Sequence, residues 1–449
     1  MPISAISAIS VFSRARVRCA AVSAALACAA AATAAPQAGA TQQALARESC
    51  EGLRRAVSHD QAGVASGPLF LASYRPADAG REPPFEPALA GAGFTYDNAV
   101  AGIALLACGE RAAARRIGDA VVRAVAHDQS FSDGRVRNAY RAGPVAEEKP
   151  ALPGRWDAQR KQWIADAYQV STATGNVAWA ALLMLNLFQA EPSSTSASAY
   201  LETARKLLAW TEQNTRARNG QDGYNGGRFG WDNAQRAQTW KSTEHNIDIA
   251  MAAAWAARAG GQRDAPEHRQ ARTALDFVGR MWSPQEQRFY IGTKEDGATL
   301  STESSGLDAQ LWPLLAAPEG SCAWTRGLEW VEKNHRFEAG YGFSRNPDGI
   351  WTEGSAQAAA TLVARKGSAP EALWQLLASQ RAGNGLYYAT PASRISTGLA
   401  IGPDSAGADF YYYHWPHLGA TAWIALAATG FNPFTGKTAA SEATPSCPA

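Results

Sequence analysis

Two kinds of helical segment alternate along the chain. The first kind begins with polar, loop-like residues, continues into small apolar residues and occurs six times. The six beginnings and their apolar runs are Tyr96-Asp97-Asn98 with AVAGIALLACGE, Thr174-Gly175-Asn176 with VAWAALLMLNLF, Ser242 to Asp248 with IAMAAAWAARAGG, Gly306 to Gln310 with LWPLLAA, Trp351 to Ser355 with AQAAATLVARKG, and His417-Leu418-Gly419 with ATAWIALAATG. Helices that are nearly uncharged on every side are buried on every side, so the pattern predicts six internal helices.

The second kind is charged and amphipathic, and it fills the intervals. Its members cover about residues 42–58, 111–128, 199–216, 266–281, 321–335 and 369–381. Apolar residues three and four apart, with charges on the other face, are typical of helices that face water. Six internal and six external helices in strict alternation predict an all-α chain folded as an (α/α)6 toroid in a single domain. An open solenoid would show a regular period, whereas the internal starts are unevenly spaced.

The direction of the internal helices follows from their connections. Each one comes after a long segment, so all six N-termini are expected at one end of the barrel. Their polar first residues would then surround one cleft. The free N–H groups and dipoles of helix N-termini favour anions and hydrogen-bonding ligands there.

The first 35 residues have the features of a secretory signal peptide. They contain Arg14, Arg16 and Arg18, then an Ala-rich apolar run, and no acidic residue. We therefore expect a signal peptide over 1–35, the toroid domain over 36–434 and a C-terminal tail over 435–449, in a periplasmic or secreted protein. A retained anchor, or a lipid on Cys28, is the alternative.

Cleavage of this segment would remove three positive charges from a formal net charge of +2. The remaining charge is close to neutral, which indicates no nucleic-acid partner and no membrane partner after cleavage. Nothing in the pattern specifies an oligomeric state. Four cysteines would remain, Cys50, Cys108, Cys322 and Cys447. Two disulfides are expected, with three pairings open, and the absence of a Cys/His cluster argues against structural zinc.

The best candidate for chemistry is the start of the third internal helix. Glu244 and Asp248 are four residues apart and would project from one helix face. Paired carboxylates near a buried cleft can protonate a leaving group and activate a nucleophile. The structural alternative is a capping box built on Ser242 or Thr243. That alternative does not require Asp248.

Three further acids hold similar positions at other internal helix starts. Glu353 follows Trp351 and precedes a glycine, which would let a substrate approach the backbone. Asp97 and Asp308 begin the first and fourth internal helices. We predict Glu244, Glu353 and Asp97 as catalytic candidates, and Asp248 and Asp308 as substrate-binding ones. Each could instead be an ordinary helix cap.

The last internal helix is preceded by a run of aromatic residues that suits a substrate platform. So many polar ring substituents would be difficult to satisfy in a core. The predicted substrate-binding residues are Tyr412, His414, Trp415 and His417 from this run, with His245, Trp240, Tyr341 and Trp351 from elsewhere. Packed loop aromatics are the alternative for each ring. The histidines lack metal-type spacing, so no metal is expected, and no GxSxG motif supports a serine nucleophile.

The twelve-helix pattern with acidic helix starts resembles the six-hairpin glycosidase superfamily, which contains glycoside hydrolases, lyases and sugar epimerases. The resemblance implies a carbohydrate substrate, no cofactor, and an acid/base carboxyl pair, placed here on Glu244 with Glu353 or Asp97. A periplasmic or secreted glycoside hydrolase acting on an oligo- or polysaccharide is the leading hypothesis. The alternatives are a polysaccharide lyase or sugar epimerase that uses His or Tyr, and a glycan-binding protein without catalysis.

Overall fold

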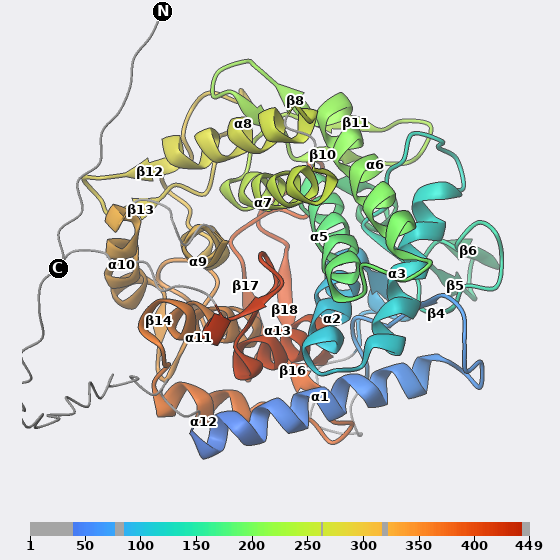
Figure 1. Ribbon diagram of the computed structural model, residues 1–449, viewed down its shortest axis with the longest axis horizontal. Coiled ribbons are helices and arrows are strands. Elements are labelled where there is room, and N and C mark those ends of the chain that lie inside the picture. Colours follow the sequence, from blue (N-terminus) through green and yellow to red (C-terminus); the bar gives the residue numbers. More distant parts are fainter. Residues whose placement is uncertain (1–38, 77–84, 262–263, 317–321, 442–449) are drawn as a thin grey trace, which may run out of the picture. The chain divides into compact units, whose positions relative to one another are not determined.

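The computed structural model describes residues 39–76, 85–261, 264–316 and 322–441. Twelve helices form two concentric rings (Figure 1). The inner ring consists of α2 (Thr95–Ala107), α5 (Thr174–Ala190), α7 (Thr243–Gly260), α9 (Leu307–Ala316), α11 (Thr352–Lys366) and α13 (Leu418–Thr429). The outer ring consists of α1 (Ala40–Asp60), α3 (Arg111–Ala126), α6 (Ala197–Thr215), α8 (Pro266–Met281), α10 (Gly327–Asn334) and α12 (Glu371–Ser379). The predicted (α/α)6 toroid is therefore confirmed.

Packing between neighbouring helices closes the inner ring. Each inner helix packs on the next one in sequence, and α13 packs on α2 to complete the circle. Helix α1 packs on α13, so the first hairpin of the ring joins the two ends of the described chain. The expected external helix over 321–335 is a 3-10 turn, Cys322–Arg326, followed by the short α10. The α4 segment (Ala167–Val170) is a single turn outside the rings.

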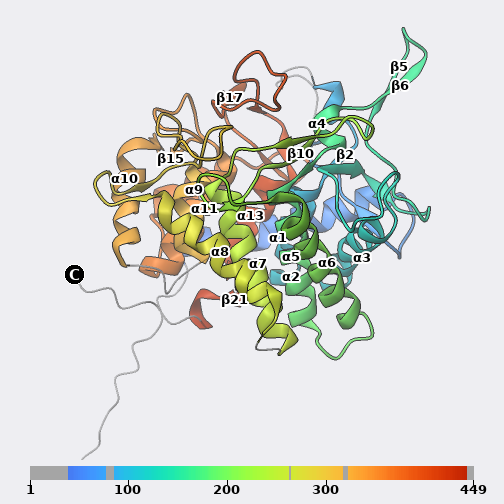
Figure 2. The same ribbon diagram turned by 90° about the horizontal axis from the view of Figure 1, so that it is seen from above.

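Short antiparallel strand pairs connect the hairpins, and most of them gather at one end of the ring (Figure 2). They are β1 (Leu69–Phe70) with β4 (Gly143–Pro144), β2 (Ala92–Phe94) with β3 (Ala139–Arg141), β5 (Arg155–Asp157) with β6 (Gln162–Ile164), β8 (Arg216–Ala217) with β9 (Gly223–Tyr224), β12 (Trp282–Ser283) with β13 (Arg288–Phe289), β14 (Arg336–Phe337) with β15 (Gly340–Tyr341), β16 (Tyr387–Tyr388) with β19 (Pro416–His417), β17 (Arg394–Ser396) with β18 (Tyr411–Tyr413), and β20 (Phe431–Asn432) with β21 (Lys437–Thr438). β10 (Gly227–Phe229) pairs with both β7 (Thr172–Ala173) and β11 (Arg236–Gln238). Two 3-10 turns, Pro87–Leu89 and Ala439–Ser441, complete the described elements.

One polar contact recurs at five of the six inner helices. The side chain of the fourth helical residue accepts a backbone N–H of the preceding connection, in a strand or directly after one. The pairs are Asn98 with Leu71, Asn246 with Tyr224, Gln310 with Phe289, Ser355 with Tyr341 and Thr421 with Tyr387. In α5 this position is Val177. The contact satisfies backbone groups that would otherwise be buried without partners, and it holds each connection against the first turn of its helix.

Aromatic rings fill the middle of the inner ring. Trp179, Trp312 and Trp423 come from three different inner helices, and their ring centroids lie 5.1 to 6.0 Å apart. Phe434 packs on Trp179 and Trp312 and is fully buried. Within the described residues no helix is long and apolar enough to cross a membrane.

One predicted disulfide is present. It joins Cys50 of α1 to Cys108 at the end of α2, and so links two hairpins of the ring. Cys447, the expected signal peptide over 1–35 and most of the tail lie outside the described residues.

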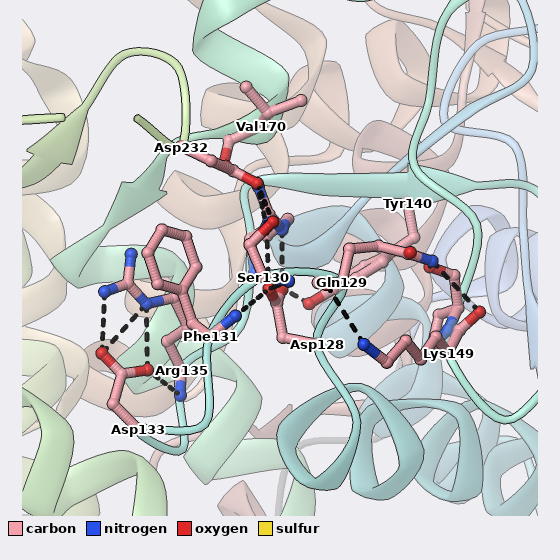
Figure 3. A network of polar contacts seen from close by, with 12 residues as sticks. Asp128, Gln129, Ser130, Phe131, Asp133, Arg135, Tyr140, Lys149, Val170 and Asp232 are labelled. Carbon is pink, nitrogen blue, oxygen red and sulfur yellow. Dashed lines mark hydrogen bonds and ion pairs between the residues drawn. The ribbon is translucent and has the colours of Figure 1, made fainter. Parts of the chain in front are cut away.

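A buried ion-pair network fixes the connection between α3 and α4 (Figure 3). The Arg137 side chain is fully buried between Asp128 and Asp232, with N–O distances of 2.6 Å to each. Its neighbour Asn138 accepts a bond from Ala173 N and donates one to Tyr168 O. Arg137 therefore supports the segment that lies between the starts of α2 and α5.

We expect Arg137→Met to lower the free energy of unfolding by about 3–5 kcal/mol, because two carboxylates would lose their buried cation. Chemical denaturation measures the change. Arg160→Met is the matched control, since Arg160 pairs with Asp157 at the surface and its loss should cost less than about 1 kcal/mol. Equal effects of the two substitutions would contradict a stabilising role of the buried network.

Candidate active site

Five carboxyl groups from four inner helices converge at the end of the ring where the connections lie. They are Asp97 of α2, Glu244 and Asp248 of α7, Asp308 of α9 and Glu353 of α11. All except the partly exposed Glu244 are at most 6% exposed. The structure therefore brings together the acidic residues that the sequence analysis selected at separate helix starts.

Burial raises the pKa of four of these acids, and repulsion by neighbouring carboxylates adds to the shift in Glu244, Asp248 and Glu353. Burial is the largest cause in each case because it disfavours the charged form. The charges of Asp308 and Glu353 raise the pKa of Glu244 further, to well above its usual value. The pKa of Asp308 rises to about 6, and that of Glu353 to about 7. The group therefore holds protons at a pH where ordinary carboxyl groups are ionised.

Asp248 is the most deeply buried acid of the group. It is fully buried, and neither of its oxygens makes a hydrogen bond of normal geometry among the described residues. Burial raises its pKa well above the usual value, and the charges of Glu244 and Asp308 raise it further, while the Trp179 side chain opposes the shift. Burial without a hydrogen-bond partner disfavours the charged form of a carboxyl group, which is the main reason for the raised pKa of Asp248.

His417 lies between two of the acids. Its Nε2 is 3.3 Å from Asp97 Oδ2, and its Nδ1 is 3.7 Å from Glu353 Oε2. Burial lowers the pKa of His417, but the hydrogen bond and charge of Asp97 and the charge of Glu353 outweigh burial, so the net shift is upward. Nδ1 also accepts the N–H of Ala420 and so caps α13. These contacts fix the orientation of the ring.

Asp97, Glu353 and His417 are also the described group whose ligand atoms are close enough to hold a metal ion, all within 4.8 Å of one another. The histidine does not fit that role in this arrangement. Its Nδ1 lone pair accepts the N–H of Ala420, which leaves the proton on Nε2 facing Asp97. A metal ligand needs a free lone pair, so the three residues fit a hydrogen-bonded cluster better than a metal site.

Hydrogen bonds position the Glu353 carboxylate. Its Oε1 accepts bonds from Tyr96 Oη at 2.6 Å and from Gln357 Nε2 at 3.3 Å. The indole of Trp423 donates to Tyr96 Oη in turn. The other oxygen, Oε2, is buried and has no hydrogen-bond partner among the described residues. Hydrogen bonds therefore fix one oxygen of Glu353 and leave the other unpaired.

His245 and Trp240 lie together beside the carboxyl groups, with ring centroids 5.5 Å apart. Both side chains are partly exposed, as expected for residues that contact a substrate. Burial lowers the pKa of His245 to about 4, so its imidazole is neutral at neutral pH. Its Nδ1 has no hydrogen-bond partner. The Ser242 side chain caps α7. This is the capping role that the sequence analysis gave as the alternative to a catalytic site.

Tyrosines surround the acids. The charges of Asp97 and Glu353 contribute to raising the pKa of Tyr74 and Tyr412, after burial, and Glu244 contributes in the same way to Tyr168. Of these, the sequence analysis selected only Tyr412. Tyr96 was part of a quoted helix start, but its contact with Glu353 follows from the closure of the ring and has no local signal.

Four predicted substrate-binding residues have other roles. Trp415 is 1% exposed and packs among Tyr74, Phe85 and Tyr413, so it belongs to the core. The Tyr341 hydroxyl donates to Glu332 of α10, and no acid of the site acts on it. Trp351 is buried behind Tyr412. His414 stacks on Tyr388 and bonds to Thr390 O. These rings pack because the connections are folded down onto the helix starts.

Solved structures with the same architecture show where this fold occurs. A glycosidase variant in complex with glucose matches with a TM-score of 0.55 at 13% identity, over 87% of this chain and 98% of that one. A cellobiose 2-epimerase of Bacillus thermoamylovorans matches with 0.57 at 10%, over 86% and 99%. A GH76 α-mannanase of Bacteroides thetaiotaomicron matches with 0.51 at 11%, over 86% and 95%. These likenesses show that the chain shares the (α/α)6 fold of these proteins. No family model and no curated protein matches the sequence.

Gly419 provides the space for the acids in this six-hairpin fold. It is the second residue of α13. A Cβ atom at this position would lie 2.7 Å from Asp97 Oδ1 and 2.9 Å from Glu353 Oε2. The sequence analysis quoted Gly419 as part of a helix start but assigned it no role, because its importance depends on neighbours from two other helices.

We expect Gly419→Ala to lower the free energy of unfolding by about 1–3 kcal/mol, the usual effect of overpacking a core. Gly279→Ala is a matched control inside helix α8, where an added Cβ meets nothing within 4 Å. That control should raise stability by up to about 1 kcal/mol, because alanine is the better helix former. Chemical denaturation of both variants is the measurement, and a Gly419→Ala protein as stable as the wild type would contradict the proposed crowding.

Proposed function

We propose that the protein hydrolyses glycosidic bonds of a neutral oligo- or polysaccharide, with Glu244 as general acid and Glu353 as general base or nucleophile. The observation that carries the proposal is the convergence of carboxyl groups with raised pKa values from α7 and α11, which lie on either side of α9 in the ring. Hydrolysis requires two such groups that flank the bond.

The environments of the two acids suit these roles. A general acid must hold its proton at the working pH, and the pKa of Glu244 lies well above its usual value. A general base works best with a pKa near that pH, and the pKa of Glu353 is about 7. Asp97 is less suited to flank a substrate with Glu353, because His417 lies between the two.

The charges of the site favour an uncharged sugar. Among the described groups that shift the pKa of the four affected acids, the only base is His417. A uronate would add another carboxylate to this cluster without a cation to pair it, which is costly in a buried environment. This argues against the polysaccharide lyase alternative, whose substrates are uronides.

We also propose that the enzyme acts outside the cytoplasm, in the periplasm or the medium. The leader-like pattern of residues 1–35 supports this location. The Cys50–Cys108 disulfide supports it independently, because such bonds persist in oxidising compartments.

The test is a panel of neutral glucans, mannans and xylans beside uronides, read by release of reducing ends. We expect turnover of a neutral substrate and a bell-shaped dependence of kcat/KM on pH. Activity should rise through about pH 7 as Glu353 loses its proton, and fall at higher pH as Glu244 ionises.

Glu244→Gln and Glu353→Gln should each lower kcat by at least about 100-fold, the scale of general acid–base catalysis. Glu202→Gln, at an exposed position of α6, is the control and should not change the rate. Full activity of Glu353→Gln, or preferential cleavage of uronides, would refute these assignments.

Sugar epimerisation is the second candidate function, and the neutral imidazole of His245 favours it. A neutral imidazole with an unpartnered nitrogen beside the acids could remove a proton from carbon. Two of the structural neighbours are named as epimerases.

Incubation with cellobiose, mannobiose and the hydrolysed substrate in D2O separates the two reactions. Epimerisation beside a carbonyl replaces a carbon-bound proton with one from solvent, whereas hydrolysis leaves all C–H bonds intact. We expect no deuterium on carbon by NMR. Incorporation that is lost in His245→Asn would establish the epimerase instead.

A further inference from the structure

The strands β17 and β18 enclose residues 397–410, which we call the flap. The flap leads into α13 by way of β19 and lies on the connection end of the ring (Figure 2). Seen along the ring axis, β17 and β18 project over the middle of the inner helices (Figure 1). The flap therefore precedes the last inner helix and lies at the end of the ring where the acids converge.

The outer end of the flap contacts the opposite side of the ring. Asp404 Oδ2 lies 2.6 Å from Arg236 Nη2 in β11, and Gly402 packs so closely on Phe229 of β10 that a Cβ atom there would lie 2.3 Å from the ring. The β10–β11 hairpin leads into α7, which is three places from α13 in the closed order of six inner helices. The flap consequently spans the site from one side to the other.

The stem of the flap supplies a residue of the site. Tyr412 of β18 interacts electrostatically with Glu353, Asp97 and Asp308. Its ring also lies 6.1 Å from that of His417. The position of β18 is therefore coupled to the arrangement of the acids.

The flap is ordered internally but is held weakly at its outer end. Asp409 accepts the N–H of Ile401, and Thr397 pairs with Phe410 across the base. By contrast, the Arg236–Asp404 pair is 54% and 71% exposed, and exposed pairs contribute little to stability. Such an element can open as a unit and close again.

We propose that the flap is a lid that covers the candidate active site and restricts it to chain ends and short oligosaccharides. This rests on the proposed hydrolysis. A polysaccharide lying across the site would have to pass through the space that the Gly402–Phe229 and Asp404–Arg236 contacts occupy, whereas a chain end can enter beneath the flap. Opening of the outer contact then admits substrate and releases product.

Spin labels on Ala237→Cys and Ala406→Cys test the closed position without any substrate. Pulsed electron resonance should give one short, narrow distance distribution. Asp404→Arg should lower the ratio of closed to open forms by about fivefold, the effect of losing an exposed ion pair. The exchanged pair Arg236→Asp/Asp404→Arg should restore it. A broad, long distribution in the protein with the native ion pair would overturn the lid.

The mode of cleavage tests the restriction. On the best neutral polysaccharide of the panel, reducing ends should accumulate with little loss of viscosity, and oligosaccharides labelled at one end should shorten stepwise. Replacing residues 400–408 with two glycines should shift cleavage towards the middle of the chain. Rapid loss of viscosity with the wild type would overturn the proposed restriction. If no substrate is turned over but the label distance is short, the proposed hydrolysis is refuted and the closed position of the flap is supported.

Discussion

The structure depends on how the first turn of each inner helix is held. Buried backbone N–H groups need hydrogen-bond partners, and here the helix starts are buried together with their connections. The fourth residue of five inner helices accepts a backbone N–H of the preceding connection, as Asn246 Oδ1 does from Tyr224 N. The connections are thereby fixed against the first turns of the inner helices.

The second position of each inner helix is where most of the site residues and the space around them are found. Around the ring it is occupied by Tyr96, Gly175, Glu244, Asp308, Glu353 and Gly419. Three of these residues are acids, and the two glycines leave space for neighbours: Gly175 for His245, and Gly419 for Asp97 and Glu353. Equivalent positions of different helices thus supply three acids and, at Gly419, the space for two carboxyl groups, which explains why acids so distant in sequence raise one another's pKa.

The sequence predicted the ring because burial requires apolar, uncharged helices and solvent requires charged ones, and both patterns are local. It also predicted the acids at the helix starts. It assigned no role to the fourth helical position, where Asn246 and its equivalents hold the connections. It also misplaced Trp415 and Tyr341, because whether a loop aromatic packs or faces a ligand depends on how the connection folds. The flap contact between Asp404 and Arg236 joins residues 168 positions apart and has no local signal.

Interactions outside the site compensate for the unfavourable burial of its acids. Asp248 and one oxygen of Glu353 are buried without hydrogen bonds of normal geometry to any described residue, which opposes folding. Well-satisfied polar groups lie nearby, above all the Arg137 network between α3 and α4 and the contacts of the fourth helical residues. Because those groups fix the backbone, the acids cannot relax away from one another. Exclusion of water then keeps their pKa values high, and a lid closed over them would strengthen that effect when substrate is bound.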